Sequence, residues 1–305
     1  MKVSICIPTY NGAKFVAEAV RSALSQGGSV ELVISDSGSN DGTLEIIRRE
    51  CAGAAMPVRI LEEKTPGMVS NWNALIRAAQ GEYVKFLFQD DLLHKGCVER
   101  MLAAARGDRR IGLVFCRRDL LIDSSAESSP VTKYLLKYAE LHKGFGKLKE
   151  RQSGSSLIGE RTLFDQPLNK IGEPTAVMVR KDAAIEAGLF SVKMRQLVDW
   201  EFWVRIMARC DVAYVDERLA TFRVHEGQMS VENEGVDEDR EYADLLNTLA
   251  SANVFGHLHR SIRMRIYRQM VASGATMGET PSRMDRVCVA MSDAGHAARK
   301  ALGLA

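Results

Sequence analysis

Two adjacent carboxylates, Asp90 and Asp91, are the residues of this chain best placed to do chemistry. They stand where the apolar run of residues 83–88 ends and a polar turn begins. In a sheet of parallel strands with covering helices, ligands bind in the crevice beyond the carboxyl ends of the strands. Carboxylate oxygens are the ligands that a hard divalent cation prefers. The pair therefore predicts a site where Mg2+ or Mn2+ holds a diphosphate.

Two other predicted strands end in polar, flexible residues. Residues 3–12 begin as an apolar run, which Pro8 halts and which opens into a loop at Asn11 and Gly12. Residues 31–36 lead directly into a turn of small residues before a predicted helix. Because the carboxyl ends of parallel strands meet at one edge of a sheet, we expect all three strand ends to line the same crevice.

The elements that must position these residues alternate between strand and helix up to about residue 118. Residues 12–26 and 70–80 carry apolar side chains at helical spacing, and residues 111–116 form another buried-strand pattern. This alternation predicts an α/β fold. Residues 119–172 break the rhythm, and we expect them either to form the wall of an acceptor cleft or to be a mobile surface loop.

Five stretches occur in an order and spacing that resemble glycosyltransferase family 2. They cover roughly the first three quarters of the chain. They are PTYNG at 8–12, SDSGSNDGT at 35–43, GEYVKFLFQDDL at 81–92, DWEFW at 199–203 and FRVH at 222–225.

The resemblance implies a GT-A fold, which is a Rossmann-like, mostly parallel sheet with covering helices. The GT-A domain is expected over residues 1–230, with a nucleotide-binding half at 1–92 and an acceptor half at 93–230. A C-terminal helical extension is expected at 231–305. The implied activity is inverting, metal-dependent transfer from a nucleotide-sugar donor to a hydroxyl of a saccharide, a lipid-linked glycan or another small acceptor, as in polysaccharide biosynthesis.

For the metal site, the resemblance makes Asp90 the direct ligand of Mg2+ or Mn2+. Asp91 is a second ligand or a cap for the following helix, and His225 reaches back to the metal or the diphosphate. The family's motif is commonly Asp-x-Asp followed by a third acid, and here Phe88 replaces the first acid.

The nucleotide pocket implied by the resemblance departs from the family at two positions. Ser37 stands where a second acid often reads the base or ribose, and Trp72 replaces the arginine of an Arg-Asn pair, where we expect it to be a core residue. Either Lys64 or Arg223 could replace the lost cationic contact to the diphosphate. The residues expected to bind the nucleotide are Pro8, Thr9, Tyr10, Asn11, Asp36, Ser37, Lys64, Asn73, Gln89, Asp90 and Arg223.

Asp199 is the predicted general base, since the family supplies this carboxylate from the acid before an aromatic at a helix start. Inverting transfer needs a carboxylate on the acceptor side to take the hydroxyl proton. Position at a helix N-terminus is expected to lower the pKa of Asp199 and favour its ionised form. Glu201 is the reserve candidate, and Glu173 is expected beside the reacting carbon.

Composition agrees with a cytoplasmic enzyme. The chain has 41 basic and 39 acidic residues and a net charge of +2, which gives no general electrostatic reason to bind nucleic acid. The six cysteines form no CxxC pair, so buried, reduced thiols are expected. The sequence shows neither a signal-peptide layout nor an apolar run of the ~20 residues that span a bilayer. Any membrane contact is expected to be peripheral, at the inner face of the membrane.

Three alternatives compete with a glycosyltransferase. A nucleotidyltransferase of the same fold needs a Gly-rich, basic phosphate loop, which residues 8–11 do not supply. A dinucleotide oxidoreductase needs a GxGxxG motif after the first strand, which is absent. A non-catalytic sugar-nucleotide sensor or assembly subunit is favoured by Phe88 and by Val198 in the slot of a common Glu, but has no need of Asp199.

Overall fold

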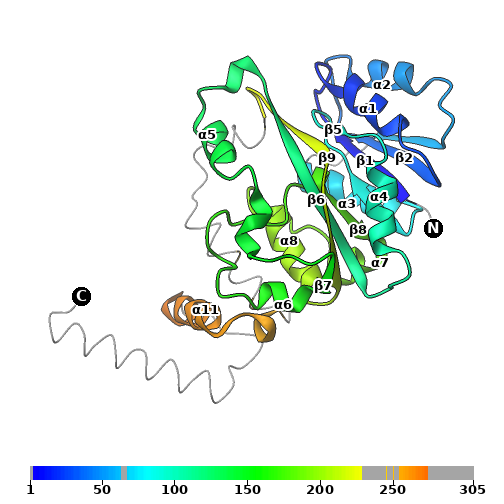
Figure 1. The fold of residues 1–305 in the computed structure, drawn as a ribbon. Coiled ribbons are helices and arrows are strands. Elements are labelled where there is room, and N and C mark those ends of the chain that lie inside the picture. The colour runs from blue at the N-terminus through cyan, green and yellow to red at the C-terminus, as the bar shows by residue number, and fades with distance from the viewer. Residues whose placement is uncertain (1–2, 63–66, 229–244, 246–249, 251–253, 274–305) are drawn as a thin grey trace, which may run out of the picture.

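The computed structural model describes residues 3–62, 67–228, 245, 250 and 254–273 (Figure 1). The strands are β1 (Val3–Thr9), β2 (Val30–Asp36), β3 (Val58–Glu62), β4 (Tyr83–Phe86), β5 (Leu92–Leu93), β6 (Ile111–Ile122), β7 (Arg151–Ser153), β8 (Val177–Arg180) and β9 (Asp211–Val224). The α-helices are α1 (Val16–Leu24), α2 (Thr43–Cys51), α3 (Met68–Ala78), α4 (Cys97–Ala105), α5 (Pro130–Lys137), α6 (Gly154–Ile158), α7 (Lys181–Glu186), α8 (Val198–Met207) and α11 (Arg260–Ser273). The short 3-10 helices are η1 (Ser124–Ala126), η2 (Leu141–Phe145), η3 (Pro174–Ala176) and η4 (Phe255–His257).

The strands form one nine-stranded sheet within the described part of the chain, in the order β3-β2-β1-β4-β8-β6-β9-β5, with β7 paired to β9. The first four strands of this order are parallel to one another. β8 runs antiparallel between β4 and β6, whereas β6 and β9 are parallel. The prediction of an α/β fold with a mostly parallel sheet and covering helices is confirmed. β1, β2 and β4 therefore end at the same edge.

Alternation along the central strands divides the core between the two faces of the sheet. Val3, Ile5 and Ile7 of β1 pack in one apolar cluster with residues of α1, α2 and α4. Cys6 points to the opposite face, into a cluster that holds residues of α3 and α8. Both sets are almost fully buried, as expected for strands covered by helices on both faces. Among the described cysteines, Cys6 is one of five free thiols.

The second half of the sheet extends further than the sequence pattern indicates. β6 continues to Ile122 and β9 runs for 14 residues, so the stretch expected to be irregular from residue 119 begins after β6 ends. That stretch contains α5, η2, β7 and α6 and is not a structureless loop. The end of β6 is polar and partly exposed, which conceals its strand pattern. The end of β9 is buried, and its Phe222 and Val224 belong to a small cluster separate from the main core. The register of this pair shifts around Arg117 and Arg118, and such irregularities re-aim side chains.

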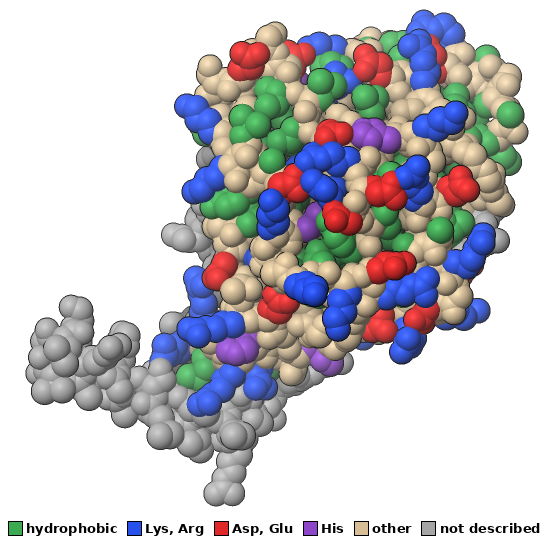
Figure 2. Space-filling view, viewed as in Figure 1, with side chains coloured by type: hydrophobic (Ala, Val, Ile, Leu, Met, Phe, Trp, Pro, Cys, Tyr) green, Lys and Arg blue, Asp and Glu red, His purple; other side chains and the backbone are tan. Residues whose placement is uncertain are grey.

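The C-terminal extension is described only in part. Ile262 and Ile266 of α11 are buried in the cluster that also holds α8, while Arg260, Arg265 and Arg268 are exposed at its surface. In the described part of the chain, none of the helices has the length and apolar character that crossing a membrane requires. On the face drawn in Figure 2, basic and acidic side chains are interspersed, in keeping with the small net charge.

Candidate functional site

Asp90 and His225 meet at the carboxyl edge of the sheet. Nε2 of His225 lies 3.0 Å from Oδ2 of Asp90, and Nδ1 of the same ring lies 2.7 Å from the carbonyl oxygen of Glu226. The ring packs on Phe15, with centroids 4.6 Å apart. Both ring nitrogens thus face oxygen acceptors, whereas a neutral imidazole carries only one N–H. The hydrogen bond to Asp90 raises the pKa of His225, so this pair favours the protonated imidazole.

Asp91, which we expected as a second metal ligand or a helix cap, is buried and points into the fold. Its side chain is fully buried, Oδ2 accepts a 2.5 Å hydrogen bond from the Thr175 hydroxyl, and Oδ1 accepts one from the Arg223 N–H at 2.9 Å. Burial, and then the charge of Asp90, raise the pKa of Asp91 well above its ordinary value. It does not cap the next helix either, because α4 follows Gly96. Pairing of β5 with β9 turns this carboxylate into the fold, where it holds the backbone of Arg223.

Arg223 is close to the predicted diphosphate position but is already engaged. Its Nε donates to the Asp90 carbonyl oxygen at 2.8 Å, and a terminal nitrogen lies 2.6 Å from a Glu18 oxygen. The guanidinium carbon lies 4.5 Å from the centre of the Phe15 ring. Arg223 therefore fixes the backbone at Asp90, and Glu18 on α1 partly neutralises its charge.

The ends of β1 and β2 are joined through Asp36. Oδ2 of this carboxylate accepts hydrogen bonds from the hydroxyls of Thr9 and Ser39, at 2.8 and 2.6 Å. Oδ1 accepts from the backbone N–H groups of Gly38 and Ser39, and the side chain is only 1% exposed. The N–H of Ser37 donates to the Thr9 carbonyl. Asp36 and Thr9 thus shape the loop that follows β2, and neither presents a free polar atom to a base.

Tyr10, Asn11 and Gln89 form the rim of the same edge. Gln89 pairs with the backbone of Tyr10 in both directions, at 2.9 and 3.1 Å, which ties the loop after β1 to the turn that carries Asp90. A Cβ at Gly12 would lie 2.3 Å from Oε1 of Gln89, so only glycine permits this approach. Tyr10 is 58% exposed, while the predicted contact residue Pro8 is buried within β1.

Asn73 and Trp72 lie in the core, away from the carboxylates at the strand ends. Asn73 is buried, and its amide binds both the carbonyl and the N–H of Phe190, at 2.9 and 3.0 Å, so we leave it out of the nucleotide site. Trp72 is a core residue, as predicted, and stacks on Phe88 with centroids 4.9 Å apart. Phe88 in the acid's slot is thereby explained as an extension of the aromatic core. Lys64 lies outside the described residues.

Asp199 stands in the first turn of α8, in the half of the chain where we expect the acceptor to bind. Its Oδ2 accepts a 2.9 Å hydrogen bond from the amide of Asn169, and Oδ1 accepts one from the N–H of Trp200. Burial raises the pKa of Asp199 to about 7, and the negative charge of Glu173 adds to the rise. The expectation of a lowered pKa is wrong because the helix terminus contributes less than the loss of solvent. A carboxylate with this pKa is well matched to a general base near neutral pH.

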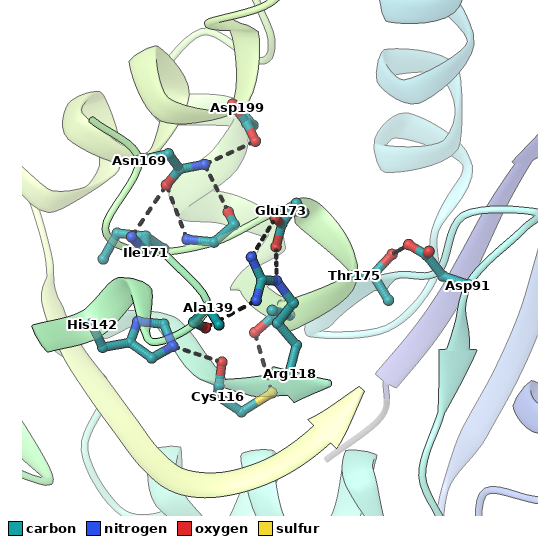
Figure 3. A network of polar contacts seen from close by, with 12 residues as sticks. Asp91, Cys116, Arg118, Ala139, His142, Asn169, Ile171, Glu173, Thr175 and Asp199 are labelled. Carbon is teal, nitrogen blue, oxygen red and sulfur yellow. Dashed lines mark hydrogen bonds and ion pairs between the residues drawn. The ribbon is translucent and has the colours of Figure 1, made fainter. Parts of the chain in front are cut away.

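Glu173, Arg118 and Thr175 complete the acceptor side (Figure 3). Arg118 binds both carboxylate oxygens of Glu173, at 2.9 and 3.1 Å, and donates to the Ala139 carbonyl at 3.1 Å. Burial would raise the pKa of Glu173, but the charge and hydrogen bonds of Arg118 outweigh it and hold the pKa below its ordinary value. Glu173 is thus an anion beside the more readily protonated Asp199, and such separated pKa values are typical of acid–base sites.

The reserve candidate Glu201 lies in the core and is paired with an arginine. It is fully buried and forms a two-point ion pair with Arg205 four residues later, at 2.6 and 2.7 Å. Arg205 in turn donates to the carbonyl oxygens of Ala187 and Leu189. This pair anchors α8 to the loop after α7 and contacts no acceptor surface.

Sequence reasoning missed Asn169, Arg118 and the anchoring role of Thr175. Each acts through a contact more than 25 residues away in the chain. The carboxylates at the strand ends can be recognised in the sequence because a short apolar run precedes them directly. An amide in a loop gives no comparable signal.

The mostly parallel α/β sheet with covering helices has the GT-A fold, which solved glycosyltransferase structures share. The chain belongs to glycosyltransferase family 2, whose model, described as glycosyl transferase family 2, matches residues 4–171. The resemblance seen in the motifs is thereby confirmed, and the chain is a glycosyltransferase.

Named relatives and solved structures agree with the family. An uncharacterised protein from Mycobacterium tuberculosis is 34% identical over 72% of this chain and 66% of its own length. Chondroitin synthase from Escherichia coli is 37% identical over 37% of this chain, which spans only 16% of that relative. Residues 1–349 of TarS from S. aureus, in complex with UDP-GlcNAc, superpose with a TM-score of 0.66 at 16% identity, covering 89% of this chain and 73% of that one. A mannosyltransferase from Pyrobaculum calidifontis, in complex with GDP-Man and Mn2+, superposes with a TM-score of 0.57 at 16% identity, covering 96% of this chain and 79% of that one.

Proposed function

We propose that this chain transfers a glycosyl group, with inversion, from a nucleoside diphosphate sugar to a hydroxyl of a saccharide, a lipid-linked glycan or another small acceptor, as in polysaccharide biosynthesis. The nucleotide binds at the edge formed by Thr9, Asp36 and Asp90, and Asp199 is the base. TarS binds UDP-GlcNAc and the mannosyltransferase binds GDP-Man, which supports the donor class.

One observation carries this proposal. The loop of residues 169–175 binds the acceptor-side carboxylate at one end and the strand-end turn at the other. Asn169 donates to Asp199, and Thr175 donates to Asp91, the neighbour of Asp90. Glu173 lies between these two contacts and is ionised by Arg118. A donor diphosphate at Asp90 would therefore place its reacting carbon toward Glu173 and Asp199.

The residues at the strand edge fit a divalent cation with few protein ligands. Among the described residues, no group of three or more His, Cys, Asp or Glu side chains is placed to hold a metal ion. Asp90 and His225 supply two candidate ligands, and phosphate oxygens and water would supply the others, as is common for Mg2+ bound with nucleotides. When bound, the cation neutralises the departing diphosphate.

The protein residues then divide the remaining work. Gln89 and Gly12 fix the loop after β1, against which the nucleotide lies. Asp199 accepts the acceptor's hydroxyl proton as that oxygen attacks the anomeric carbon from the face opposite the leaving group. Glu173 remains ionised and accepts a hydrogen bond from a second hydroxyl of the acceptor, which orients the attacking one.

A panel of nucleotide sugars, with and without Mn2+ or Mg2+, tests the proposed donor class. In the presence of metal, one sugar nucleotide should raise the unfolding temperature by several degrees, because a ligand that binds only the folded state stabilises it. The panel should include UDP- and GDP-sugars, with nucleoside monophosphates as controls. If no sugar nucleotide raises the unfolding temperature above the monophosphates, the proposed donor site is wrong.

The pH profile of transfer should report Asp199. Since the base must be ionised, and the pKa of Asp199 is about 7, kcat/KM should fall about tenfold per unit as pH drops below 7 and level off above it. Nucleotide affinity measured over the same range separates this effect from the titration of His225. A profile that is flat between pH 5.5 and pH 8 would exclude Asp199 as the base.

A further inference from the structure

Asn169 makes four hydrogen bonds, and together they determine how its amide is oriented. Oδ1 accepts from the N–H groups of Ile171 and Gly172, at 3.1 and 2.9 Å. Nδ2 donates to the Gly172 carbonyl at 3.0 Å and to Oδ2 of Asp199 at 2.9 Å. Reversing the amide would point two donors at N–H groups and an oxygen at a carboxylate, so only the present orientation is compatible with the network.

The loop that carries Asn169 is anchored on both sides. The adjacent Lys170 is only 1% exposed, and its ammonium donates to the carbonyl oxygens of Leu163, Asp165 and Pro167, at 3.0, 2.6 and 3.0 Å. The carbonyl of Lys170 lies 2.7 Å from a ring nitrogen of the buried His142. An amide in a loop fixed this firmly can hold another side chain in one place.

The far side of the loop carries the second anion. The indole N–H of Trp203 donates to the Gly172 carbonyl at 3.0 Å, the same oxygen that Asn169 binds. Glu173 follows directly and is clamped by Arg118. The charged groups around Asp199 are thus Glu173 and, behind it, Arg118, since Glu201 on the same helix is paired with Arg205.

We infer that Asn169 is a positioning residue for the reaction: one amide fixes the direction of the Asp199 carboxylate and the conformation of the loop that presents Glu173 to the acceptor. The inference rests on the proposed role of Asp199. Because the amide binds both partners, the base and the acceptor-orienting anion keep a fixed relative geometry. The Asn169 N–H also stabilises the ionised form of Asp199 in a site where burial and Glu173 oppose it.

Three variants separate the parts of this role. Asn169→Ala removes every contact, whereas Asn169→Asp keeps an oxygen for the two loop N–H groups and loses the donor to Asp199. Trp203→Phe removes the other hydrogen bond to the Gly172 carbonyl without touching Asp199, and so is the matched control. Thermal unfolding and circular dichroism check that each variant is folded.

The decisive measurement needs no substrate. The Asp199 carboxyl is titrated by 13C NMR in the full chain labelled at aspartate, with its signal assigned by Asp199→Asn. We expect its pKa to rise by about one unit in Asn169→Ala, as loss of a hydrogen bond to a charged group requires, and further in Asn169→Asp. Trp203→Phe should titrate like the unaltered protein.

Transfer kinetics supply the second measurement, with the sugar nucleotide that the panel identifies. The midpoint of the pH profile of kcat/KM should move to higher pH in Asn169→Ala and further in Asn169→Asp. At pH 7, kcat of Asn169→Ala should fall at least tenfold, with little change in donor affinity. Unchanged titration in both Asn169 variants, or an equal shift in Trp203→Phe, overturns the inference while leaving the proposed function standing. Loss of the proposed function would instead appear as absent nucleotide binding in the unaltered protein.

Discussion

Replacing Asp199 with Asn is expected to lower the rate of transfer by about 100-fold to 10,000-fold, with donor affinity nearly unchanged. The amide is similar in size to the carboxyl but cannot take the acceptor's proton. Donor affinity should be spared because the hydrogen bonds of the Asp199 side chain go to Asn169 and Trp200. The side chains at the nucleotide edge, Asp90 and Gln89, bind His225 and Tyr10 instead. The rate is measured as product formed in single turnovers, and affinity by calorimetry with the nucleoside diphosphate and metal.

Glu201→Gln is the control for this experiment, and it should behave in the opposite manner. The substitution removes the negative charge of the buried ion pair and leaves the charge of Arg205 uncompensated, which typically costs about 3–5 kcal/mol of stability. The unfolding temperature should therefore fall sharply, while the enzyme that remains folded keeps its rate per active site. If Asp199→Asn turns over normally and Glu201→Gln is inactive although folded, the roles must be exchanged.

The strand-end residues could be predicted because their signal is local. An apolar run followed by acids, or by small polar residues, gives the position of Thr9, Asp36 and Asp90 at one edge once the strands are parallel. Parallel pairing follows from the alternation of strands with helices. Asp199 is predicted differently, from the resemblance of residues 199–203 to a later motif of the family. Its charge state was misjudged because burial depends on distant segments.

The burial of Asp91 and Asn73 could not be predicted either, because it also depends on segments far away in the sequence. Asp91 is turned inward by Arg223, 132 residues later, and by Thr175, 84 residues later. Asn73 is held by the backbone of Phe190, 117 residues later. Pairing of neighbouring acids in a sequence says nothing about which one faces solvent. Only the antiparallel contact of β5 with β9 decides that Asp90 stays partly accessible and that Asp91 is buried in a structural role.

The different surroundings of these two acids lead to a prediction about metal. Asp90→Asn should weaken metal-dependent binding of a nucleoside diphosphate at least 10-fold to 100-fold, because it removes a negative charge next to His225 while keeping the shape of the side chain. Folding should be little affected, since the backbone carbonyl of Asp90, and not its carboxylate, holds Arg223. Affinity is measured by calorimetry with excess Mn2+ and again with a chelator.

Asp119→Asn is the matched control, because it makes the same change in charge on β6, where the partly exposed carboxylate pairs with Arg218 at 2.9 Å. It should leave affinity unchanged. In Asp90→Asn, affinity with metal should fall close to the value seen with chelator, since the cation then loses its one charged protein ligand and keeps only His225. Equal affinity of the unaltered protein with and without metal would remove the cation from the proposal. A loss in Asp119→Asn as large as in Asp90→Asn would point to general electrostatic attraction instead of a metal site.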